Sequence, residues 1–144
     1  MQTDNQNVEL RIRSLRTLWI ALVLSIGAYF VFTRFAPRSE DLAPNNLLSM
    51  ILIVVAAATM LISFPIKSKL LTNASNGGQV QQAYIVAWAV TEVGALLGVL
   101  DYLLTPDRYY YALFLIALCG QLLHFPRSEH VINAAFRTDR ESLR

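Results

Sequence analysis

Glu92 places a carboxyl group in the middle of an apolar stretch, AWAVTEVGALLGVLDYLL, which runs from Ala87 to Leu104. A helix from Gln82 to Leu104 is about 34 Å long at 1.5 Å per residue, which puts Glu92 close to its midpoint. An ionised acid at the centre of a membrane-spanning helix costs about 2.5–3.5 kcal/mol, so burial favours the neutral acid. The sequence therefore predicts a proton- or sodium-binding site at Glu92. The alternative is a hydrogen-bonded Glu that only fixes helix packing, within the chain or against a partner.

A hydroxyl partner for Glu92 is expected on the first apolar stretch of the chain. Tyr29 and Ser25 lie nearest to the depth of Glu92, and the Tyr29 hydroxyl is the predicted hydrogen-bond partner. Asp101 is expected near the outer interface, where Arg108 can meet it as a surface ion pair.

A second set of residues on the same stretch is small. Gly94 and Gly98 form a G-x-x-x-G pair, the spacing that lets another helix approach closely. Glu92 lies well around the helix from this pair, so the small face and the acid need not meet the same neighbour. The predicted helix-packing face consists of Ala87, Thr91, Gly94 and Gly98.

Gln121 and His124 are spaced i, i+3 and share one face of the last apolar stretch. A histidine can relay a proton or respond to pH, which makes the pair a candidate proton relay. The alternative is that His124, close to Arg127, only anchors the helix at the interface. By helical rise, both residues lie too far toward the cytoplasm to contact Glu92 directly.

The composition of the chain indicates a membrane protein. The 144 residues are 55% hydrophobic and 15% charged, with a mean hydropathy of +0.44. Four apolar stretches approach the roughly 20 helical residues that cross a hydrocarbon core, and only helices or closed barrels satisfy their backbone in lipid. We therefore expect an all-α integral membrane protein, a single membrane domain of four transmembrane helices packed as two hairpins. The predicted spans are 17–35, 46–66, 82–104 and 109–125, with tails at 1–16 and 127–144.

The basic residues predict the orientation of the spans. Of the twelve Lys and Arg residues, nine fall in the tails and between the second and third spans, and three on the other side. Positive charge is retained in the cytoplasm, so both termini are expected there, in a multi-pass cell-membrane protein, with a bacterial inner membrane as the expected location. The tail from Ser128 and the segment Val8–Arg16 are each expected to lie on the inner leaflet or to dock a partner.

Two pairs of segments resemble each other along the chain. The end of the second span, LISFPIKS from Leu61, resembles LLHFPRSE from Leu122, with Phe-Pro in register. The segment 19–37 aligns in the same way with 88–106. A tandem duplication of one hairpin would explain both, and Val23 would then occupy the place of Glu92; chance similarity of two span ends is the alternative.

The run Glu92-x-x-Ala95-Leu96-x-Gly98-Val99-Leu100 resembles the ion-carrying helix of the proteolipid, or c, subunits of rotary ATPases. The resemblance implies that Glu92 binds the translocated proton or sodium ion. The family carries a glycine-rich stripe on the partner helix, whereas this chain has Ala-Ala-Ala-Thr at 56–59.

Catalytic chemistry is not expected from this sequence. No phosphate-binding loop, nucleophile elbow or H-E-x-x-H motif occurs, so we expect no enzyme, no cofactor, no metal and no nucleic-acid partner. The predicted partners are the lipid bilayer and other membrane-protein subunits or a second copy of the chain. We expect a subunit or assembly component of a larger membrane complex; the alternatives are a proteolipid-like protein that binds H⁺ or Na⁺ through Glu92, and a small transporter.

Overall fold

The chain folds into four helices. The structure, a computed structural model, describes residues 2–37, 45–106 and 108–134, with side chains from Val8 onward. The helices are α1 (Gln2–Phe35), α2 (Asn46–Thr72), α3 (Gly77–Leu104) and α4 (Tyr110–Leu123), and residues 128–134 are also helical. The described part of the chain contains no strand, which confirms the all-α prediction.

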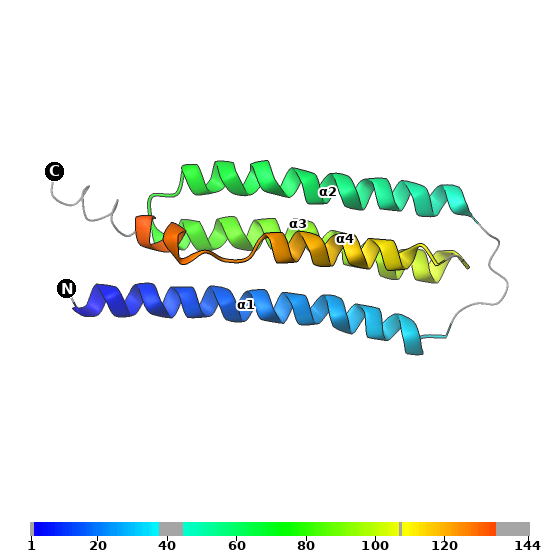
Figure 1. The fold of residues 1–144 in the computed structure, drawn as a ribbon, viewed down its shortest axis with the longest axis horizontal. Coiled ribbons are helices and arrows are strands. Elements are labelled where there is room, and N and C mark those ends of the chain that lie inside the picture. The colour runs from blue at the N-terminus through cyan, green and yellow to red at the C-terminus, as the bar shows by residue number, and fades with distance from the viewer. Residues whose placement is uncertain (1, 38–44, 107, 135–144) are drawn as a thin grey trace.

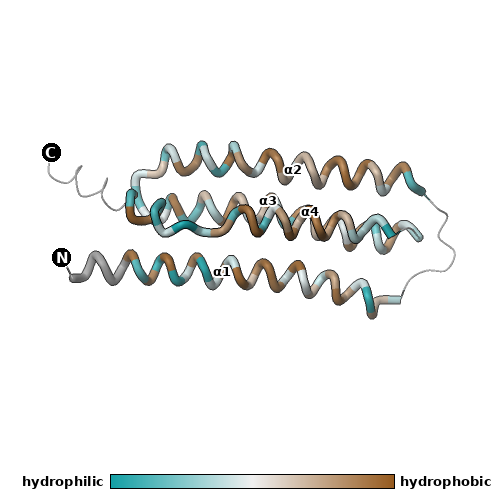
Figure 2. Tube along the Cα trace, in the orientation of Figure 1, coloured by the Kyte–Doolittle hydropathy of each residue, from teal (hydrophilic) through white to brown (hydrophobic). Residues whose placement is uncertain are grey.

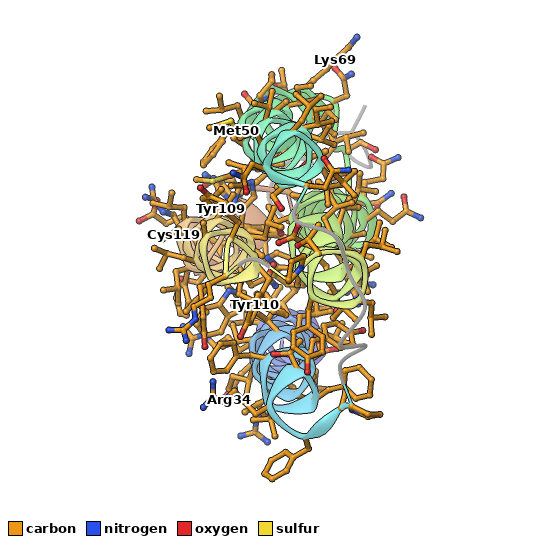
Figure 3. The ribbon with its side chains drawn as sticks, turned by 90° about the vertical axis from the view of Figure 1, so that its right-hand side faces the viewer. Arg34, Met50, Lys69, Tyr109, Tyr110 and Cys119 are labelled. Carbon is orange, nitrogen blue, oxygen red and sulfur yellow. The ribbon has the colours of Figure 1, made fainter. Side chains whose placement is uncertain are left out.

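The central pair of helices is α3 and α4, and α1 and α2 lie on opposite sides of it (Figures 1 and 3). The predicted first hairpin is therefore not a packed pair, because α1 and α2 each pack on the central helices instead of on each other. Cys119 lies on the outer side of α4 and is exposed (Figure 3).

Three of the helices are long and apolar enough to cross a membrane: 8–35 of α1, α2 and α3. Their hydrophobic residues dominate the middle of the bundle, and hydrophilic residues gather toward its ends (Figure 2). Helix α4 is apolar but shorter, with 14 residues. At 1.5 Å per residue it spans about 21 Å, less than the roughly 30 Å of a hydrocarbon core.

The two Phe-Pro sequences act differently on their helices. Pro126 follows the end of α4, whereas Pro65 lies inside α2, which continues to Thr72. An asparagine side chain caps the start of α2 and another caps the start of α3. Asn45 accepts a hydrogen bond from the Leu48 amide at 3.1 Å, and Asn76 accepts one from the Gln79 amide at 3.0 Å. Such caps satisfy amides that have no partner in the first turn.

The segments expected on the inner leaflet each pack one face on the bundle. Residues 8–16 continue α1 without a break, and Leu15 is only 1% exposed. Leu15 packs in one apolar cluster with Val80 of α3 and Val131 of the segment 128–134, at the end of the bundle where α1 begins (Figure 1). Leu15 and Val131 therefore face the bundle, while Leu10 and Ile132 of the same segments stay exposed, so their contact with a leaflet or a partner stays a prediction. Residues 135–144 of the predicted tail, with Phe136 and its basic residues, lie outside the described part.

Candidate functional site

Glu92 contacts α1 through a serine. The Oγ of Ser25 lies 2.6 Å from Oε1 of Glu92 and 2.8 Å from the carbonyl oxygen of Leu22. Both distances are typical of O–H···O hydrogen bonds. Glu92 itself is half-buried, so its carboxyl group lies between α1 and α3 at the edge of the bundle.

The Ser25 hydroxyl has two acceptors within hydrogen-bond distance but carries only one hydrogen. A serine hydroxyl donates once and accepts twice. With Glu92 ionised, one hydrogen serves two acceptors. With Glu92 protonated, the acid donates to Ser25 and Ser25 donates to Leu22, so each contact has its own hydrogen. The arrangement of oxygen atoms can therefore hold Glu92 with a shared Ser25 hydrogen, or with a proton on the acid and a separate hydrogen for each contact.

Tyr29 is not the partner that the sequence predicted. The hydrogen bond that the structure gives Glu92 comes from Ser25, one turn earlier on α1. Tyr29 is half-buried and packs against the apolar cluster of Ile26, Ala95 and Phe114. The predicted depth on α1 was correct, and the identity of the hydroxyl was wrong.

The small face of α3 is buried within the chain. Ala87, Thr91, Gly94 and Gly98 are all buried. A Cβ added to Gly94 would lie 3.3 Å from Cβ of Ala117, and one added to Gly98 would lie 3.2 Å from the ring of Phe114. The G-x-x-x-G pair therefore brings α3 against α4 of the same chain, and it is not open to a partner.

Gln121 joins three helices. Its side-chain oxygen accepts a hydrogen bond from Thr91 of α3 at 2.8 Å, and its backbone carbonyl accepts one from the Trp19 indole of α1 at the same distance. The side chain is fully buried, and its amide nitrogen has no hydrogen-bond partner. Gln121 thus reaches the residue next to Glu92 without contacting Glu92 itself.

His124 is buried, not exposed at the interface. Its Nδ1 lies 2.8 Å from the Gly120 carbonyl and its Nε2 lies 3.1 Å from Oγ of Ser63 in α2. Its own carbonyl accepts a hydrogen bond from the Trp88 indole at 3.0 Å. Among the described residues, no hydrogen bond joins Gln121 or His124 to Glu92, so the predicted relay is not connected to the acid in this conformation.

A second buried acid lies where the sequence predicted a surface pair. Asp101 is 0% exposed, and its Oδ1 accepts hydrogen bonds from Ser49 at 2.6 Å and Thr105 at 3.2 Å. Its Oδ2 is buried without a hydrogen-bond partner, while Arg108 is exposed. The prediction was wrong because α2 covers this side of α3. The signal for it was the seven-residue spacing of Ser49, Ala56 and Ser63, which places three small buried residues on one face of α2.

Comparisons with known proteins identify no relative of this chain: no family model, no curated protein and no solved structure matches. Within the described residues, no group of three or more potential ligands could hold a metal ion. The candidate site is therefore defined by its own geometry, a carboxyl group and a serine hydroxyl between two helices.

Proposed function

We propose that this chain is an integral membrane protein with four helices in the membrane, of which α4 is shorter than the hydrocarbon core is thick, and that Glu92 takes up and releases a proton. Both termini lie in the cytoplasm, as the basic residues favour. The observation that carries the proposal is the pair of contacts made by Ser25, which supplies one hydrogen to the Leu22 carbonyl and, with Glu92 protonated, receives one from the acid.

A proton explains this contact better than a sodium ion does. The two oxygens of Ser25 and Glu92 are 2.6 Å apart, a hydrogen-bond distance that leaves no space for a cation between them. Hard cations also need several oxygen ligands at once. The local resemblance of Glu92–Leu100 to the ion-carrying helix of proteolipid subunits agrees with proton binding at this position.

The test is the reaction of Glu92 with a carbodiimide, which attacks protonated carboxyl groups. Labelling of the purified protein is expected to fall as the pH rises, to be absent in Glu92→Gln, and to shift its pH dependence in Ser25→Ala because that variant removes the acceptor of the acid's proton. Mass spectrometry of the labelled protein also measures the reaction of Asp101, the second acid on α3, which serves as the comparison.

Two results would count against the proposal. Labelling of Glu92 that is constant between mildly acidic and alkaline pH would show no exchangeable proton. Protection by sodium chloride, but not by potassium chloride at equal ionic strength, would replace the proton with a sodium ion.

A second proposal is that the chain is a subunit or accessory component of a larger membrane complex. The apolar outer face of α2 favours it: Leu47, Val54 and Leu61 are each about two-thirds exposed. Lipid and a partner helix can both cover this face. A large side chain placed there should disturb packing against a partner helix but not contact with lipid. Val54→Trp is expected to reduce the size of the complex in native electrophoresis of mild-detergent extracts, and Leu115→Trp on α4 is the matched control. Equal size for both variants and the wild type would contradict this proposal.

A further inference from the structure

A cavity of about 470 Å³ lies between α2 and the segment that follows α4. Three of its lining residues are basic, Lys67, Arg127 and His130, and three are apolar, Phe64, Leu71 and Leu123. The volume is within the range of small-molecule binding sites. Its walls combine positive groups on one part with hydrocarbon on another.

Tyr84 of α3 holds the basic groups together. Its ring lies beneath Lys67, whose Nζ is 4.4 Å from the ring centroid. Its hydroxyl accepts a hydrogen bond from the Arg127 amide at 3.0 Å and lies 2.6 Å from Nδ1 of His130. Tyr84 is fully buried, so the Lys67 ammonium, the His130 ring and the Arg127 backbone are positioned by contacts with one buried side chain.

The basic groups oppose one another electrostatically. Burial lowers the pKa of His130 from its usual 6.5, and the positive charges of Lys67 and Arg127 lower it further, against the opposite effect of Glu129. A negative charge in the cavity would reduce this repulsion, because opposite charges stabilise each other over such distances.

The proposed insertion of the chain would place the cavity at the depth of a lipid headgroup. Helix α2 changes from apolar to basic after Ile66, and Phe64 and Leu123 at the apolar wall are 38% and 61% exposed. The basic side of the bundle is the side expected in the cytoplasm, where anionic lipids attract lysine and arginine side chains.

We propose that this cavity binds the phosphate group of an anionic phospholipid, with the headgroup between Lys67 and Arg127 and the acyl chains along Phe64 and Leu123. The inference rests on the proposed insertion of the chain into a membrane, and it is independent of the proton at Glu92.

The test compares two lysines on the same helix. Lys67 lines the cavity, whereas Lys69 projects from α2 away from the centre of the bundle (Figure 3). Protein in detergent is titrated with phosphatidylglycerol or phosphatidylcholine, and bound lipid is counted by native mass spectrometry. Phosphatidylglycerol is expected to bind Lys67→Gln about fivefold more weakly than wild type, and Lys69→Gln like wild type.

A second variant tests the site independently, in case Lys67→Gln misfolds. Arg127→Gln removes a side-chain charge but keeps the backbone amide that donates to Tyr84, and it is expected to weaken phosphatidylglycerol binding in the same way. Equal binding to all variants, or equal weakening by Lys67→Gln and Lys69→Gln, would overturn the site, since either result indicates general charge attraction.

Two further measurements are needed. One distinguishes a lipid phosphate from a soluble phosphate, and the other distinguishes failure of the cavity proposal from failure of the Glu92 proposal. Inorganic phosphate or glycerol phosphate that displaces the lipid at comparable concentration would make the cavity a site for soluble anions and overturn the lipid assignment. Glu92→Gln is expected to keep full phosphatidylglycerol binding, whatever the outcome of carbodiimide labelling. Resistance of the wild type to extraction from membranes by carbonate reports separately on insertion.

Discussion

Ser63 of α2 and His124 of α4 contact each other across the bundle, with Oγ and Nε2 3.1 Å apart. The same two residues occupy matching places in the two Phe-Pro sequences, each directly before the phenylalanine. The Phe64 ring packs against the His124 ring at 4.5 Å between centroids. The two similar segments therefore meet at a shared contact, one inside a continuing helix and the other at a helix end.

Replacement of His124 is expected to destabilise the bundle strongly. His124→Ala leaves a cavity and removes the ring hydrogen bond at the Gly120 carbonyl, so we expect a loss of about 2–4 kcal/mol. Ser63→Ala is expected to cost about 1 kcal/mol, since the serine also bonds within its own helix to Met60. Unfolding in detergent, followed by circular dichroism, gives both values, and a larger loss for Ser63→Ala would contradict the contact as described.

The two tryptophans are expected to differ in their contribution to stability. Trp88 is fully buried and donates to the carbonyl of His124, whereas Trp19 is half-buried and donates to that of Gln121. Trp88→Phe leaves a void and a buried carbonyl without a partner, so it is expected to cost about 1–3 kcal/mol. Trp19→Phe should cost less, because its edge-on contact with Phe125 can be kept. The comparison requires the same detergent and the same unfolding assay for both variants.

A larger side chain on the small face of α3 is expected to push α3 away from α4. Gly98→Leu places its side chain against Phe114, and overpacking of this kind costs about 1–3 kcal/mol or more. The control is Gly27→Leu on α1, where an added Cβ meets no atom within 4 Å. Gly98→Leu should lower the melting temperature and Gly27→Leu should not. A lowered complex size with an unchanged melting temperature would instead indicate that the face binds a partner.

The buried acid near the C-terminal end of α3, Asp101, is expected to act as a hydrogen-bond acceptor. Asp101→Asn keeps an oxygen for Ser49 and carries no charge, so its melting temperature should equal or exceed that of the wild type. Asp101→Ala leaves the Ser49 hydroxyl without this acceptor and should cost about 1–3 kcal/mol. A decrease for the asparagine as large as that for the alanine would show that the ionised carboxylate is required.

Acidification is expected to loosen the segment 128–134. Because the pKa of His130 is lowered in the folded state, chiefly by burial, the unfolded chain binds a proton first as the pH falls. The stabilisation is therefore complete above about 6.5 and decreases as the pH falls from there toward the lowered pKa. Hydrogen exchange of residues 128–134 across this range measures the effect, and His130→Phe should abolish its pH dependence while Tyr84 remains buried.

Much of the fold could be predicted because apolar length and helical rise are local properties. The four apolar stretches match the four helices, and the depth of Glu92 along α3 correctly pointed to the part of α1 that carries Ser25 and Tyr29. Rise along a helix gives depth but not rotation, and rotation decides which of two hydroxyls one turn apart faces the acid.

The contacts between helices were harder to predict. The sequence placed Asp101 at the surface because it does not state which helix covers which face, and the order of helices in space differs from their order in the chain. The burial of Gly94 and Gly98 against α4 has the same origin, since a G-x-x-x-G pair predicts a close neighbour without naming it.

The position of α3 and α4 between the outer helices has a consequence for biosynthesis. During translation, α1 and α2 leave the ribosome first, before the residues that will separate them exist. Because α1 and α2 contact α3 and α4 far more than each other, most of the packing within this chain that involves α1 and α2 requires α3 and α4. A chain stalled on the ribosome after α2 would therefore lack the helices that α1 and α2 contact in the folded protein.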